Sequence, residues 1–177
     1  GSIENIIVDS LNAINTGNFI FLRIGERNKG QKGMLKNISI SNVNAEIPAT
    51  KADLGYYYEG PIEHLPRNIS PASIVGMPDV AIENISFKNV EIHYPGDANP
   101  IYAKVDLSAL DSIPELADRY PEFSMFKELP AWGFYIRHAK GISFDNVTMS
   151  CKKKDFRVPI VLDDVHGAIF KNLKIDE

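Results

Sequence analysis

The chain has 177 residues, of which 44% are hydrophobic and 24% are charged, with a formal net charge of -4 at pH 7. This composition is ordinary for one globular domain with a packed core. The net charge argues against a broad basic surface for nucleic acid, and there is no apolar run of about 18 residues that could span a membrane. We therefore predict no nucleic-acid partner and no membrane partner.

A short pattern recurs along the chain. From Ile82 apolar residues alternate with polar ones as far as Phe87, the alternation shifts at Asn89, and it resumes at Val90 and Ile92. This pattern predicts a strand, a corner and a second short strand. The same pattern recurs at 35–47, 139–149 and 165–175, and more faintly at 3–11.

The corners of these repeats are marked by Ser10, Asn42, Asn89, Asn146 and Asn172, which are spaced by 32, 47, 57 and 26 residues. A unit of about 25 residues cannot bury its apolar face alone, so we expect successive units to stack with their strands paired in parallel. Asparagine at a corner tolerates the left-handed conformation and can bond its amide to the next repeat. The fold predicted is all-β, a right-handed parallel β-helix spanning 1–177.

A second strand is expected in each repeat, at 19–24, 134–137 and 160–163. Stretches rich in Gly and Pro interrupt the pattern at about 25–34, 48–80 and 94–130, and we expect loop insertions there. The last insertion should hold one short helix, because Ser112 and Glu115 form a capping box with Pro114 in the first turn.

Candidate catalytic groups are few. Asp163, Asp164 and His166 have the chemistry of acid-base hydrolysis, but they fall at a corner and adjacent strand residues point to opposite faces. We interpret them as structural. The spacing of His and of the lone Cys151 matches no metal site, and no phosphate loop is present, so we predict no metal and no cofactor.

Candidate substrate-binding groups are cationic or aromatic. Arg23 at a strand end, with Arg27 and Lys29 in the following loop, could clamp a carboxylate; the alternative is a solvated charged loop. Tyr57 and Trp132 could stack on sugar rings or else anchor the insertions to the sheet. We add Arg137, which ends the 134–137 strand.

Asn5, the turn at Thr16-Gly17-Asn18 and the strand that ends in Arg23-Ile24 form a further pattern. It resembles the segment of glycoside hydrolase family 28, the polygalacturonase-like pectin hydrolases, that leads to their Arg-Ile-Lys motif. Gly25 stands where that family has a substrate-binding lysine. The stretches 71–76 and 129–141 look like the carboxy-terminal half of Bacteroides-type members.

This resemblance implies a right-handed parallel β-helix and hydrolysis of α-galacturonosidic bonds with inversion. In that family the catalytic aspartates precede the Arg-Ile-Lys segment, in an Asn-Thr-Asp motif, an Asp-Asp pair and a Gly-His-Gly neighbour. We therefore expect a carboxy-terminal section of such a glycosidase that has no catalytic residue of its own. The resemblance also implies an acidic, pectin-derived poly- or oligosaccharide as partner and a secreted or periplasmic location.

Two further expectations concern a non-catalytic role and self-association. The chain could instead be a non-catalytic β-helix that binds glycans or forms a structural stack. A solenoid without visible caps exposes unpaired strand edges, so we also expect self-association through its ends.

Overall fold

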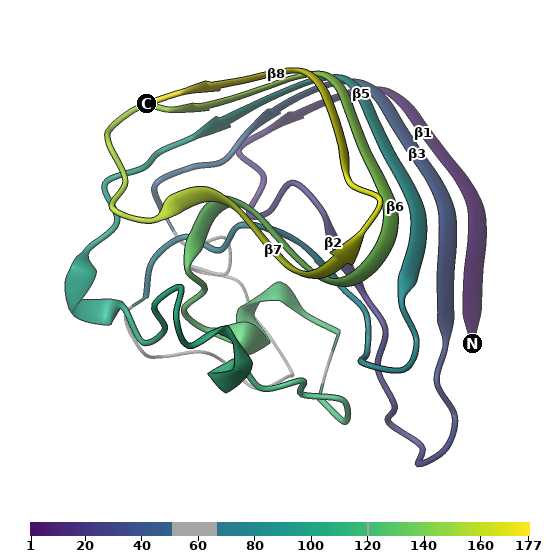
Figure 1. The fold of residues 1–177 in the computed structure, drawn as a ribbon. Coiled ribbons are helices and arrows are strands. Elements are labelled where there is room, and N and C mark those ends of the chain that lie inside the picture. Colours follow the sequence, from purple (N-terminus) through teal and green to yellow (C-terminus); the bar gives the residue numbers. More distant parts are fainter. Residues whose placement is uncertain (51–66, 120) are drawn as a thin grey trace.

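The computed structural model describes residues 1–50, 67–119 and 121–177 (Figure 1). Its strands form a single eight-stranded sheet, curled into a half-barrel, in which every pair of named strands is parallel. The strands are β1 (Ser2–Ile14), β2 (Phe21–Arg23), β3 (Met34–Glu46), β4 (Ala72–Val75), β5 (Ile82–Tyr94), β6 (Ala131–Cys151), β7 (Val158–His166) and β8 (Ile169–Asp176). The prediction of an all-β fold with parallel pairing is confirmed.

The longer row of strands follows the sequence repeats. β1, β3, β5 and the second half of β6 lie side by side, and β8 continues the row (Figure 1). Val8, Ile40, Phe87, Phe144 and Phe170 occupy one column across these strands. This register reproduces the spacings of 32, 47, 57 and 26 residues predicted from the corner positions.

The shorter row is made of β2, β4, the first half of β6, and β7. Phe134 pairs with Ile160 and Arg137 with Asp163, as expected for the second strand of each repeat. The stretch 48–80 is not one uninterrupted insertion, because β4 belongs to this row. The four residues of β4 are all buried between β2 and β6. A run of four buried residues is too short to be distinguished from loop sequence by its pattern.

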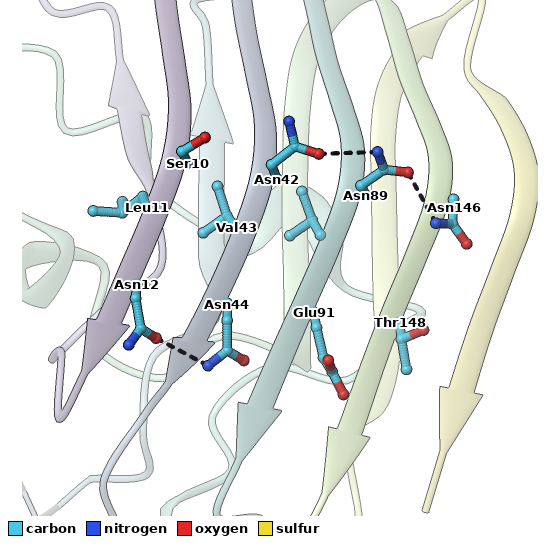
Figure 2. Close-up of a pocket in the computed structure, with 11 residues that line it drawn as sticks. Ser10, Leu11, Asn12, Asn42, Val43, Asn44, Asn89, Glu91, Asn146 and Thr148 are labelled. Carbon is cyan, nitrogen blue, oxygen red and sulfur yellow. Dashed lines mark hydrogen bonds between the residues drawn. The ribbon is translucent and has the colours of Figure 1, made fainter.

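Asparagines turn the chain at the corners. Asn37, Asn84 and Asn89 have φ of 57°, 58° and 53°, a left-handed conformation that asparagine adopts at low cost. Asn89 Nδ2 donates to Asn42 Oδ1 and Asn146 Nδ2 donates to Asn89 Oδ1, at 3.0 and 2.9 Å (Figure 2). The predicted ladder of amides is confirmed.

The core lies inside the curl of the sheet. Phe87 and Phe144 stack with ring centroids 5.0 Å apart, and Phe134 from the shorter row meets both rings edge-on. These three side chains are at most 1% exposed. The core is therefore built by the residues that point inward from both rows.

The 94–130 insertion, called the excursion below, covers the shorter row with irregular structure and three short 3-10 helices, at Pro100–Tyr102, Leu110–Ser112 and Phe123–Phe126. The α-helix expected around 112–119 does not form in the described residues, so this prediction was wrong. Leu116 has φ of 51°, and the Glu115 side chain bonds to the sheet instead of closing a capping box. Tertiary contacts override the local signal.

The outer strands of the sheet leave apolar side chains exposed. Ile3, Ile6 and Ile7 on β1 are 53%, 40% and 79% exposed, and Ile169 on β8 is 63% exposed. None of the helices in the described part of the chain is long and apolar enough to cross a membrane.

Candidate arginine pocket

A pocket of about 290 Å³ lies where the loop after β2 meets the excursion. Three arginines line it: Arg23 at the end of β2, Arg27 in the loop, and Arg119 in the excursion. None of the described residues that line it is Asp or Glu. We call this cavity the arginine pocket.

Arg23 is held by contacts with the excursion. Its Nη2 donates to the carbonyl oxygens of Glu115 and Leu116, and its guanidinium lies 5.1 Å from the centroid of the Phe126 ring. Burial lowers the pKa of Arg23, while the charges of Asp118 and Glu115 raise it. Arginine stays protonated under such a shift, so Arg23 presents a fixed positive charge.

The loop and the excursion approach each other closely at Gly25. The Glu26 N–H donates to Ala117 O at 2.7 Å, and a Cβ placed on Gly25 would lie 3.0 Å from the same oxygen. A larger residue here would push the excursion away. The close approach gives a physical reason for glycine at position 25.

Arg27 and Arg119 complete the pocket from its more exposed side. Arg119 Nε lies 3.9 Å from Asp118 Oδ1, a long contact between two side chains that are both mostly exposed. Such a pair is weak in water, so Arg119 keeps most of its capacity to bind another anion. Planar guanidinium groups bind carboxylates with two parallel hydrogen bonds, so the pocket suits a carboxylate ligand.

A network of ionic side chains fixes the excursion beside this pocket. Arg137 Nη2 lies 3.0 Å from Glu115 Oε1, and Arg137 Nε lies 3.1 Å from Asp163 Oδ2. His138 lies between two carboxylates, with Nε2 3.1 Å from Glu115 Oε1 and Nδ1 2.6 Å from Asp164 Oδ2. Asp163 and Asp164 thus point to different partners, as expected for adjacent residues at a corner.

The conformation of this corner agrees with its structural interpretation. His138 and Asp164 have φ of 51° and 53°, matching the asparagine corners elsewhere. The hydrogen bond with His138 is the main cause that lowers the pKa of Asp164, and His166 adds a second hydrogen bond. In the described residues, no group of three or more His, Cys, Asp or Glu is arranged to hold a metal ion.

The predicted substrate-binding residues are only partly brought together. Arg23 and Arg27 share the pocket, whereas Lys29 lies exposed in the same loop without lining it. Arg137 is 7% exposed, donates to Ile113 O of the excursion, and does not line the pocket. Tyr57 lies outside the described residues.

Trp132 occupies a different environment from the one expected for a sugar-stacking ring. It is 1% exposed and packs edge-on against Tyr94, with ring centroids 5.4 Å apart, while its Nε1 donates to Glu177 Oε1. Both faces of so enclosed a ring are covered, and the alternative interpretation, an anchoring role, fits this position. Sequence reasoning missed Arg119, which lies in irregular sequence with no periodic signal.

A second hollow, of about 540 Å³, runs along the asparagine ladder (Figure 2). Its corner row contains Asn42, Asn89 and Asn146, whose amides bond to one another. A second row contains Asn12 and Asn44, which are bonded to each other in the same way. Because these amides already satisfy one another, the ladder is better suited to holding the repeats together than to binding a ligand.

No family model, curated protein or solved structure matched this chain.

Proposed function

We propose that this chain is a section of a right-handed parallel β-helix that binds an acidic oligosaccharide of the pectin type through the arginine pocket. The parent protein would be a polygalacturonase-like glycosidase that hydrolyses α-galacturonosidic bonds, secreted or periplasmic in location. The observation that carries the binding proposal is the convergence of Arg23, Arg27 and Arg119 on one cavity whose described lining residues include no Asp or Glu.

The parallel register supports the β-helix part of this proposal. Strands of the two rows alternate along the chain, and two amide ladders cross the longer row, one from β1 to β5 and one from β3 to β6. A curled sheet that closes further into a solenoid would keep this same register in additional repeats.

We assign no catalytic residue in this chain. Hydrolysis with inversion needs one carboxylic acid and one carboxylate placed on either side of the bond that is cut. Glu115, Asp163 and Asp164 are instead paired with Arg137 and His138, which suits them to holding the excursion. A non-catalytic glycan-binding module is the alternative, and it would use the same pocket.

The binding proposal is tested by titrating the chain with trigalacturonate and with neutral trigalactose in a calorimeter. We expect trigalacturonate alone to bind, and Arg27→Ala to weaken it about tenfold, because a hydrogen bond to a charged group is worth about 1.5 kcal/mol or more. Lys29→Ala is the matched control, since Lys29 lies in the same loop but outside the pocket. Equal affinity for the two sugars, or an equal effect of the two variants, would overturn the proposal.

The absence of catalysis is tested separately by measuring reducing-sugar release from polygalacturonate. We expect no turnover by the chain on its own. Turnover that is lost in Asp163→Asn would instead make the corner cluster catalytic and reverse its structural assignment.

A further inference from the structure

A larger cavity, of about 560 Å³, lies within the same excursion. Val105, Ile113, Met125 and Phe126 provide its apolar walls, and we call it the apolar pocket. Ile113 and Phe126 are 3% and 5% exposed, so these walls are fixed parts of the second core cluster. A cavity of this size accommodates a group much larger than a methyl ester.

The apolar pocket and the arginine pocket are neighbours. Arg119 lines both cavities. Arg23 lines the arginine pocket and Phe126 the apolar pocket, and the Arg23 guanidinium lies 5.1 Å from the Phe126 ring centroid. One ligand can therefore place a charged group on one side of this contact and an apolar group on the other.

The charges around the apolar pocket favour an anionic ligand. Lys104, Arg119 and Lys127 are exposed residues that line it. Glu128 is the one carboxylate among its described lining residues, and its oxygens accept hydrogen bonds from the backbone N–H and the side chain of Asn68, at 2.6 and 3.2 Å. Three cations and one carboxylate thus line the described part of this pocket, which leaves an excess of positive charge there.

We propose that the two pockets form one site for an acidic saccharide that carries an aromatic acyl ester, with the aromatic group in the apolar pocket. This inference rests on the proposed function, because it places the sugar carboxylate in the arginine pocket. A flat ring would gain contacts with the Phe126 ring and with the sulfur of Met125, both of which favour aromatic partners. The combined site would thus bind an esterified acidic saccharide in preference to unsubstituted galacturonan.

The test compares the binding of trigalacturonate and of its cinnamoyl ester to the unsubstituted 177-residue chain by calorimetry. We expect the ester to bind about tenfold more tightly. Val105→Trp should fill the apolar pocket and remove this advantage while leaving the affinity for trigalacturonate unchanged. Leu107→Trp is the matched control, because Leu107 is 54% exposed in the same excursion and does not line the cavity.

A second variant covers the case in which Val105→Trp fails to fold, as judged by circular dichroism. Met125→Ala removes part of the wall and should also weaken binding of the ester more than binding of trigalacturonate. An ester that binds no more tightly than trigalacturonate, or whose advantage survives the folded variants, overturns this inference and leaves the proposed function standing.

Free cinnamate separates the remaining outcomes. If cinnamate binds and Val105→Trp abolishes the binding while trigalacturonate does not bind at all, the apolar site stands and the proposed function fails. If neither cinnamate nor trigalacturonate binds, both proposals are overturned.

Discussion

Arg137 Nη2 lies 3.0 Å from Glu115 Oε1, and this contact joins the corner of β6 to the excursion that covers it. Arg137 also donates from Nη1 to Ile113 O at 2.7 Å. One buried guanidinium thus holds both a side chain and a backbone carbonyl of the segment that carries the pocket walls.

Replacing this guanidinium should destabilise the protein. Arg137→Met removes the guanidinium that pairs with Glu115 and Asp163, and removing one partner of a fully buried pair costs about 3–5 kcal/mol. Because the Glu115 side chain is 28% exposed, we expect a smaller loss of about 2 kcal/mol in the free energy of unfolding, measured with urea. Arg119→Met, the same change at an exposed arginine, should cost less than about 1 kcal/mol, and equal losses would contradict the anchoring role.

The contact between His138 and Asp164 should make stability depend on acid pH. The folded protein lowers the pKa of Asp164, mainly through the hydrogen bond with His138, so the ionised form favours the folded state. This contribution is fully present above the unfolded pKa of about 3.9 and is lost as the pH falls through the lower folded value. The stability difference between the parent and Asp164→Asn, measured by urea unfolding, should therefore shrink below about pH 4; a constant difference from pH 2 to 7 would contradict it.

Asn89 serves the ladder in two ways that two substitutions can separate. Asn89→Ala removes the amide that bonds to Asn42 and Asn146 and also places a less tolerant residue at φ of 53°. Together these effects should cost about 2 kcal/mol in the free energy of unfolding. Asn89→Gly loses only the amide, because glycine tolerates the positive φ, so it should lower the free energy of unfolding by about 1 kcal/mol. An equal loss in the two variants would show that the backbone conformation is not part of the effect.

The open edge of β1 should pair with another chain. Its exposed apolar residues and unpaired backbone groups make it a template for a further strand, so we expect the chain to associate as its concentration rises. Ile6→Lys should reduce this association in sedimentation velocity experiments, because a charge on an edge strand opposes pairing. Ile101→Lys, at a 71% exposed position in the excursion, is the control and should leave association unchanged.

Much of the sheet could be predicted because its signals are local and repeated. Ile85 and Ile142 alternate with polar neighbours, and Asn84 and Asn89 stand at positions where the backbone turns left-handed. The alternation of side chains and the corner asparagines together determine the register of the strands. The spacing between corners in the sequence therefore aligned the strands correctly. The short strand β4 escaped prediction because four buried residues carry no periodic pattern of their own.

The site could be predicted only where it borders the sheet. Arg23 ends a strand, and its position followed from the pattern, but Arg119 reaches the pocket from an excursion whose path is set by long-range contacts. The same contacts displaced the expected helix, since Glu115 bonds to Arg137 and His138 rather than to its own backbone. For Trp132 the sequence left stacking and anchoring both open, because proximity to an insertion does not show whether a ring points outward.

The register of the sheet is independent of how much chain separates its strands. Repeats of 32, 47 and 57 residues present the same columns to their neighbours, and amide-to-amide hydrogen bonds form across all three spacings. Selection can therefore lengthen, shorten or exchange a loop while the strands beside it keep every pairing. The sheet is a constant scaffold, and new ligand specificity can evolve in the insertions without a change in the pairing of the strands.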